Sequence, residues 1–144
     1  MERTDRPSDD DRRHERTDRQ KAGDAAESLV AERLAARGWR ILARNVHVGR
    51  SELDIVAVDP GPPARLVVVE VRWRRSREFG LAEETFDRRK RAHLKAGVAR
   101  LLEVGRLAGG GELPHLPLAL DLAIVEPGAG DRPAIRLYRN ALAG

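Results

Sequence analysis

The amino-acid sequence predicts an α/β fold in which a mixed β-sheet of about five strands is flanked by helices. Two observations predict it: apolar residues recur at helical spacing in two segments, and five short apolar runs are bounded by turn residues. These segments follow one another as a helix, three strands, a second helix and two strands, an order typical of a sheet with helices packed on it. At 144 residues the chain is long enough for one domain with a single core.

The first 21 residues differ in composition from the rest of the chain. They contain no Leu, Ile, Val, Phe or Trp, and acidic and basic residues alternate along them. Such a segment cannot bury enough apolar surface to offset the entropy lost on ordering. We therefore expect residues 1–21 to form a disordered charged tail and residues 22–144 to form the folded domain.

A helix and a strand are expected at the start of the domain. The helix is expected to begin at Asp24, because apolar residues recur at steps of three and four from Ala26 to Leu34, and Gly38 ends it. The following run, "WRILARNV" at 39–46, has the composition of a strand.

The remaining elements follow from apolar runs and the turns between them. Residues 52–58 and 65–73 flank the turn "DPGPPA", so they are expected to form an antiparallel hairpin, with the second strand central because it is apolar on both faces. A long helix, or two joined pieces, is expected over 81–105. The last two strands are expected at 118–126 and 133–140.

Two of these strands carry charged residues where a buried strand normally carries valine. Glu52 and Asp54 are two residues apart, as are Glu70 and Arg72, so each pair is expected to project from one face. A buried carboxylate without a partner costs roughly several kcal/mol, and Mg²⁺ bound by carboxylate oxygens and water removes that cost. Acids followed by Glu-x-basic form the skeleton of a metal-dependent phosphodiesterase site. The alternative is a set of acids that are solvated or matched to arginines.

Several segments of the chain resemble a known protein family. They are "GDAAESLVAERLAARGWRILARN", "SELDIVAV", "VVVEVRWR", "FGLAEETFDRRKRAHL", "LDLAIV" and "RNAL", in this order. At these residues the chain resembles the YraN-like family of poorly characterised bacterial proteins, in the PD-(D/E)XK nuclease superfamily. The resemblance covers residues 22–142 and implies a restriction-endonuclease-like fold.

The resemblance also implies an activity: hydrolysis of phosphodiester bonds in nucleic acid, expected to be DNA, with Mg²⁺ or Mn²⁺. The expected metal ligands are Asp54, Glu70, Glu52 and Glu27, and Lys90 is expected to supply an ammonium group if its helix packs over the site. Glu27 has an alternative role as the end of a capping box that starts at Asp24. Lys90 has the alternative of a solvated helix lysine.

Arg72 departs from the family pattern, which has lysine at this position. A guanidinium is planar, bulky and always charged, so it can clamp a phosphate but cannot act as a base. Two hypotheses follow: a nuclease that uses arginine at this catalytic position, or a non-catalytic nucleic-acid-binding module that keeps the fold. Asp121 is expected to be structural and paired with an arginine, and His93 to lie on a helix surface.

A basic block in the middle of the chain suggests a polyanionic partner. Residues 72–95 hold nine basic and four acidic residues, and clustered cations bind phosphates without reading sequence. A solvated basic surface is the alternative. The expected nucleic-acid-binding residues are Arg72, Arg74, Arg75, Arg77, Arg88, Arg89 and Lys90.

Composition excludes several classes of protein. The chain has no cysteine, which excludes disulfides and thiolate metal sites. No apolar run approaches the ~20 residues of a membrane span, and the first residues lack the apolar region of a signal peptide. We therefore expect a cytoplasmic protein with no membrane partner.

Overall fold

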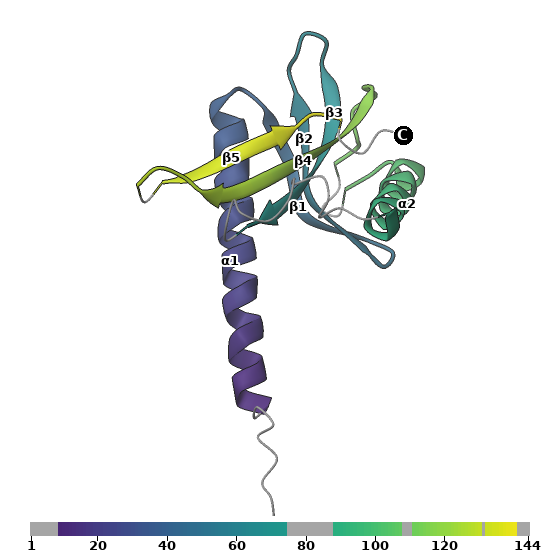
Figure 1. Ribbon diagram of the computed structural model, residues 1–144. Helices are drawn as coiled ribbons and strands as arrows, with labels where there is room; N and C mark the ends of the chain where they lie inside the picture. Colours follow the sequence, from purple (N-terminus) through teal and green to yellow (C-terminus); the bar gives the residue numbers. More distant parts are fainter. Residues whose placement is uncertain (1–8, 75–87, 108–110, 131, 141–144) are drawn as a thin grey trace, which may run out of the picture.

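In the computed structural model, a five-stranded sheet is covered by one helix on each face (Figure 1). The described residues are 9–74, 88–107, 111–130 and 132–140, with side chains from residue 20 onward except at Arg88 and Arg89. The elements are α1 (Asp9–Ala36), β1 (Arg40–Val48), β2 (Ser51–Asp59), β3 (Arg65–Trp73), α2 (Arg88–Val104), β4 (Leu118–Pro127) and β5 (Pro133–Tyr138).

The sheet is mixed, as the sequence predicts. Its strand order is β1-β2-β3-β4-β5, with β3 parallel to β4 and the other neighbours antiparallel. The β2–β3 hairpin and the central position of β3 are therefore confirmed. This α/β architecture is consistent with the restriction-endonuclease-like fold that the family resemblance implies.

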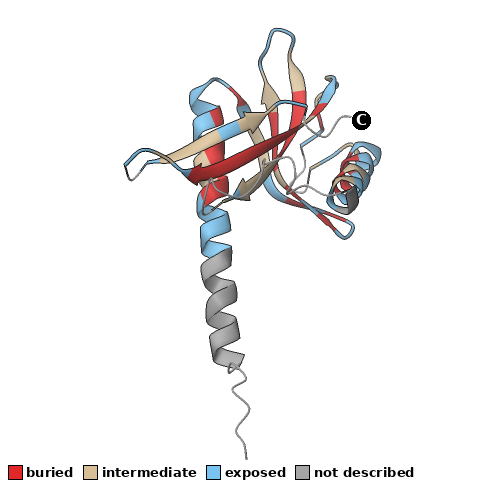
Figure 2. Cartoon of the chain, viewed as in Figure 1, coloured by how far each residue is buried: buried red, intermediate tan, exposed pale blue. Residues whose placement is uncertain are grey.

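Two apolar cores lie on the two faces of the sheet (Figure 2). Under α1, Val30 and Leu34 pack against Ile55 and Val67. Under α2, side chains that include Leu94 and Val98 pack against the opposite face of the sheet. Successive side chains of β3 point alternately into the two cores, so the residues from Leu66 to Val69 are all buried.

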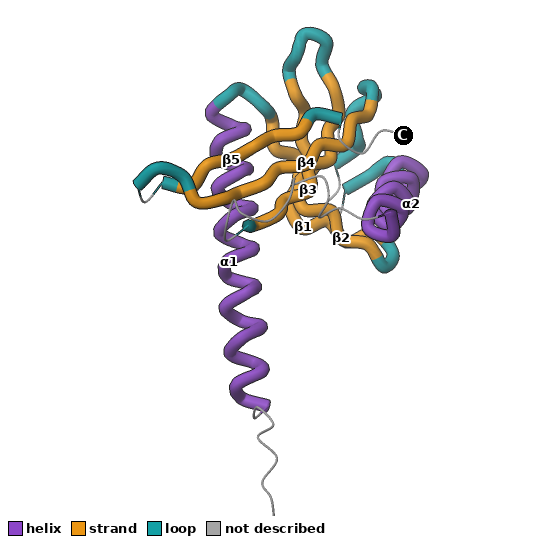
Figure 3. The backbone as a smooth tube through the Cα atoms, in the orientation of Figure 1, coloured by secondary structure: helices purple, strands orange, loops and turns teal. Residues whose placement is uncertain are grey.

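Helix α1 begins earlier than the sequence indicates. Its backbone is helical from Asp9, whereas the apolar periodicity predicts a start at Asp24. The helix therefore continues through charged sequence that offers no apolar stripe, and its first half extends away from the sheet (Figure 3). The division into a tail at 1–21 and a domain at 22–144 stays a prediction.

The second helix and the basic block are described in part. Helix α2 begins at Arg88, and the expected helical residues 81–87 lie outside the described residues, as do Arg75 and Arg77. Within the part of the chain that is described, no helix is long and apolar enough to span a membrane.

Candidate active site

Asp54 lies where strands β2 and β3 separate. Backbone pairing between these strands ends with Ile55 opposite Val69. Beyond that pair, the Val71 N–H donates a hydrogen bond to Asp54 Oδ2 at 2.8 Å. A side-chain carboxylate thus satisfies a strand N–H that a regular ladder would pair with a backbone carbonyl.

Strand β2 is irregular at the same position. Leu53 packs in the core under α2 and Ile55 in the core under α1, although residues two apart on a regular strand share a face. On the adjacent strand β1, Arg44 pairs with Ile55 and Val46 pairs with Leu53. Asn45, which lies between them, has a positive φ of 51°. The strict alternation assumed from the sequence therefore does not extend through Asp54.

Asp54 and Glu70 form a pair of neighbouring carboxyl groups, close enough for each to affect the pKa of the other. Burial, followed by the charge of Asp54, raises the pKa of Glu70 to about 8. Burial also raises the pKa of Asp54, although the hydrogen bond from Val71 opposes this effect. At neutral pH without a cation, the pair therefore holds a proton that exposed carboxyl groups would have released.

Arg72 lies two residues after Glu70 on β3 and forms an ion pair with it. The distance from Arg72 Nη2 to Glu70 Oε1 is 3.4 Å, and the side chains are 32% and 15% exposed. The positive charge of Arg72 partly offsets the effect of burial on the pKa of Glu70. The Glu-x-Arg spacing thus brings the two charged groups together.

Glu27 reaches toward the site from α1. It is buried, and Arg44 Nε lies 3.3 Å from its Oε1. Burial, followed by the charge of Asp54, raises the pKa of Glu27. The capping-box role is wrong, because α1 begins at Asp9 and Glu27 lies in the middle of the helix.

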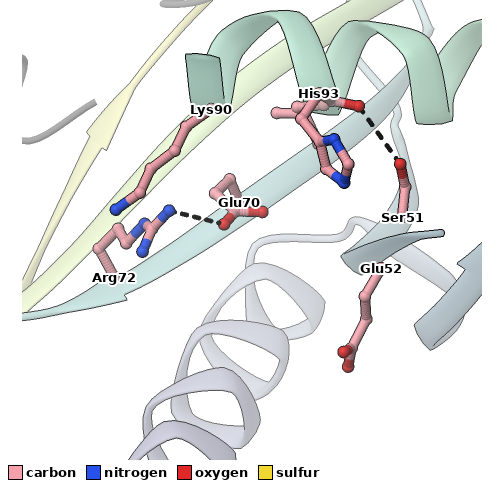
Figure 4. A pocket seen from close by; sticks show the side chains of 7 residues that line it. Ser51, Glu52, Glu70, Arg72, Lys90 and His93 are labelled. Carbon is pink, nitrogen blue, oxygen red and sulfur yellow. Dashed lines mark hydrogen bonds and ion pairs between the residues drawn. The ribbon is translucent and has the colours of Figure 1, made fainter. Parts of the chain in front are cut away.

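A pocket of about 270 Å³ opens beside the pair, between β2, β3 and α2. It is lined by Ser51, Glu52, Glu70, Arg72, Lys90, His93 and Leu94. Figure 4 shows Lys90 and His93 extending from α2 toward Glu70 and Arg72. Helix α2 therefore packs over the site, which was the condition for Lys90 to contribute an ammonium group.

His93 is a pocket residue that sequence reasoning missed. It was expected on a helix surface, and its side chain is indeed exposed, but it lines the same pocket as Glu70. Ser51 Oγ donates a hydrogen bond to the His93 carbonyl at 3.3 Å, which fixes this turn of α2 against β2. The three-residue spacing of Lys90 and His93 on one helix face was the available signal.

The carboxylates do not all gather at one point. Among the described residues, no group of three or more His, Asp or Glu side chains lies close enough to hold a metal ion. Glu52 is exposed at the pocket, and its carboxylate points away from α2 (Figure 4). Two adjacent carboxylates still suit Mg²⁺, which keeps several waters and commonly binds one or two protein carboxylates.

The other predicted residues have different environments. Arg74 is half-buried at the end of β3, and its N–H donates to the Val125 carbonyl at 2.8 Å. Asp121 is fully buried, and Arg139 Nε lies 2.7 Å from its Oδ2. The expected pairing of Asp121 with an arginine is confirmed.

Comparison with known proteins gives consistent matches. A family model described as "Uncharacterised protein family UPF0102" matches residues 26–125. A UPF0102 protein of Symbiobacterium thermophilum is 40% identical over 121 residues, covering 84% of this chain and 95% of the relative. One of Dehalococcoides mccartyi is 33% identical over 124 residues, covering 86% and 94%. One of Methylococcus capsulatus is 36% identical over 120 residues, covering 83% and 89%.

Proposed function

The chain belongs to the uncharacterised protein family UPF0102, which is the YraN family, and on that premise we propose that it is a metal-dependent nuclease. The reaction is hydrolysis of a phosphodiester bond in nucleic acid, with DNA as the first substrate to test. The cofactor is Mg²⁺ or Mn²⁺.

One observation carries the proposal: two neighbouring carboxyl groups, one of which lines a pocket, lie beside three basic side chains of the same pocket. An acidic pair disfavours a bound phosphate unless a cation lies between them. Arg72, Lys90 and His93 offer the complementary contacts to a phosphate. This combination supports a site for a metal ion and a phosphodiester together.

Each side chain has a distinct role in this proposal. Asp54 and Glu70 hold the ion, and Glu27 adds negative charge near Asp54 that favours a bound cation. When bound, Mg²⁺ or Mn²⁺ supplies a Lewis acid and an activated water. Arg72 and Lys90 bind the phosphate oxygens. His93 lines the pocket and is the side chain that transfers a proton, a role that imidazole groups commonly take in catalysis.

Arg72 supports a second candidate function, a nucleic-acid-binding module without turnover. A guanidinium retains attraction for phosphate but cannot place a compact ammonium group beside the attacking water. Retention of Asp54 and Glu70 favours the nuclease, because a module that only binds phosphates gains nothing from a carboxyl pair.

Calorimetric titration of Mg²⁺ and Mn²⁺ tests the metal site directly. Wild type is expected to give a saturable binding signal that Asp54→Asn abolishes. Glu103→Gln removes an exposed acid from α2 and serves as the charge-matched control, with binding unchanged. Equal binding by wild type and Asp54→Asn would refute the metal site.

A cleavage assay separates the two candidate functions. Wild type is incubated with single-stranded DNA, duplex DNA and RNA in each metal ion, and binding is measured alongside. Metal-dependent cleavage that Asp54→Asn abolishes supports the nuclease. Binding without cleavage of any substrate supports the module.

A further inference from the structure

A second groove lies near the candidate site, on the other side of the β1–β2 hairpin. Its volume is about 370 Å³. Strand β1, the hairpin turn, the C-terminal half of α2 and the segment after α2 form its walls. The lining includes His47, Val48, Gly49, Arg100, Val104 and Arg106.

Helix α2 connects this groove with the pocket at Glu70. Lys90, His93, Gly97, Arg100 and Val104 follow one another at steps of three and four, so they form one stripe along the helix. The first two line the pocket and the last two line the groove. Arg100 lies seven positions after His93, or roughly 10 Å along the helix axis.

The hairpin crosses this stripe between the two cavities. A Cβ added at Gly97 would lie 2.6 Å from Ser51 Cβ, so β2 meets the helix closely at that point. The turn then passes Arg100, whose Cδ and Nε would lie 3.7 Å from a Cβ at Gly49. Figure 1 shows the tip of the β1–β2 hairpin beside α2. Residues of β2 line the pocket and residues of β1 line the groove, so the hairpin tip lies between the two cavities.

The groove combines apolar walls with basic side chains. Its lining holds two arginines and a histidine but no carboxylate. Arg106 Nη2 lies 3.7 Å from Glu112 Oε1, but these side chains are 65% and 75% exposed, so the pair is weak. Val104 is 59% exposed at the rim. Apolar contacts beside guanidinium groups suit an unpaired nucleotide, whose base needs a stacking surface and whose phosphate needs a cation.

We propose that this groove binds an unpaired segment of the nucleic acid whose scissile phosphodiester occupies the pocket at Glu70 and Arg72. The proposal rests on the proposed function and specifies its substrate class: a duplex that continues into a single-stranded extension. The hairpin tip separates the two segments. Arg100 contacts a backbone phosphate or stacks on a base, while Val48 and Val104 contact the base.

Fluorescence anisotropy with two labelled DNAs tests this proposal. One is a blunt duplex, and the other is the same duplex with a ten-nucleotide single-stranded extension. Wild type is measured in Mg²⁺, and gels verify that the DNA is intact. The extension is expected to tighten binding by about tenfold, the effect of one or two stacked bases.

Arg100→Gln is expected to remove most of this preference while leaving blunt-duplex affinity nearly unchanged. It should also lower the slope of log affinity against log salt for the extended DNA by about one. Arg40→Gln, at the far end of β1, is the charge-matched control and should change neither quantity. Thermal melts confirm that both variants are folded.

Other outcomes overturn the proposal in distinguishable ways. If wild type binds blunt and extended DNA equally, or if Arg100→Gln weakens both equally, the groove does not select an unpaired segment, although the nuclease proposal stands. If a glutamate-rich peptide binds in the groove and is lost with Arg100→Gln while the extension has no effect, the occupant is an acidic peptide. If wild type binds no nucleic acid, the proposed function fails as well.

Discussion

Glu70 is a carboxyl group whose ionisation is opposed by burial and by a neighbouring acid. Its pKa is raised from 4.5 to about 8. In an unfolded chain the same side chain would release its proton near its ordinary pKa of 4.5. Between pH 4.5 and about pH 8, the folded protein therefore binds one proton that the unfolded chain has released. The unfolded state then binds fewer protons than the folded state, and stability falls as pH rises through this window.

We predict that the metal-free protein loses stability between about pH 4.5 and pH 8 because of Glu70. The contribution is up to about 1.4 kcal/mol per pH unit for one proton. Glu70→Gln should flatten this dependence, because the amide does not titrate. The measurement is urea unfolding from pH 5 to pH 9 in a chelator. Glu112→Gln, at an exposed acid, should leave the wild-type profile unchanged, and an unchanged profile in Glu70→Gln would contradict the assignment.

A second prediction at this scale concerns the cation that accompanies Glu70. Arg72→Lys is expected to raise the rate of Mg²⁺-dependent cleavage by about a hundredfold, because a compact ammonium can approach the attacking water more closely. DNA affinity should change little, since both side chains carry one positive charge. Single-turnover cleavage and anisotropy separate the two effects. If wild type is already a fast nuclease and the variant is slower, arginine is the functional residue.

At the scale of elements, most strands follow from local sequence. Alternation and turn residues predict 65–73 for β3, which spans Arg65–Trp73, and place the boundaries of the other strands within two residues. The change of face at Asp54 could not be predicted from local sequence. It depends on an interaction between strands, in which the Asp54 carboxylate replaces a backbone carbonyl as the acceptor for the Val71 N–H. The early start of α1 was also missed, since charged residues without an apolar stripe give no helical periodicity.

The contact between α2 and β2 gives a prediction for Gly97. Gly97→Ala should destabilise the protein by about 1–3 kcal/mol, because the new methyl would lie 2.6 Å from Ser51 Cβ and 2.9 Å from Ser51 Oγ. Gly23→Ala, in α1 with nothing within 4 Å of an added Cβ, should instead stabilise it by about 0.5–1 kcal/mol. Urea unfolding measures both changes.

A rescue variant tests the cause of the Gly97→Ala effect. Removing the Ser51 side chain should restore part of the lost stability, so Ser51→Gly/Gly97→Ala should be more stable than the sum of the two single effects implies. Additive effects would show that steric contact with Ser51 is not the cause.

At the scale of the whole molecule, the sequence predicts the charged residues of the candidate site better than their arrangement. The Glu-x-Arg spacing on β3 was sufficient to pair Arg72 with Glu70. Helical spacing alone could not bring Lys90 and His93 to the pocket, because that depends on where α2 packs. Nor could strand spacing reveal the direction of the Glu52 side chain, because a strand end is free to turn outward.

Arg139 joins several distant parts of the fold. Its guanidinium lies 2.6 Å from Asp59 at the end of β2 and 2.7 Å from Asp121 on β4, and 5.1 Å from the centre of the Trp39 ring. The Asn140 N–H donates to the other oxygen of Asp121 at 2.8 Å. One side chain therefore connects the segment after β5 with two strands and the α1–β1 connection.

We predict that Arg139→Gln destabilises the whole domain by about 2–4 kcal/mol. Asp121 is fully buried. Within the described part of the chain, loss of Arg139 leaves the Asp121 carboxylate with one hydrogen-bond donor, the Asn140 N–H, and its buried charge is no longer neutralised. The estimate lies below the loss of a fully buried pair, because the Arg139 side chain is 46% exposed. Urea unfolding followed by circular dichroism gives the change.

Arg106→Gln is the matched control, since its ion pair with Glu112 is exposed on both sides and should be worth less than about 1 kcal/mol. If an unpaired Asp121 charge causes the loss, Asp121→Asn/Arg139→Gln should recover part of the stability lost in Arg139→Gln, because the amide carries no charge into the core. Equal losses in Arg139→Gln and Arg106→Gln would mean that the Arg139 network does not stabilise the fold. A double variant less stable than Arg139→Gln would mean that Asp121 acts through its hydrogen bonds, with little contribution from its charge.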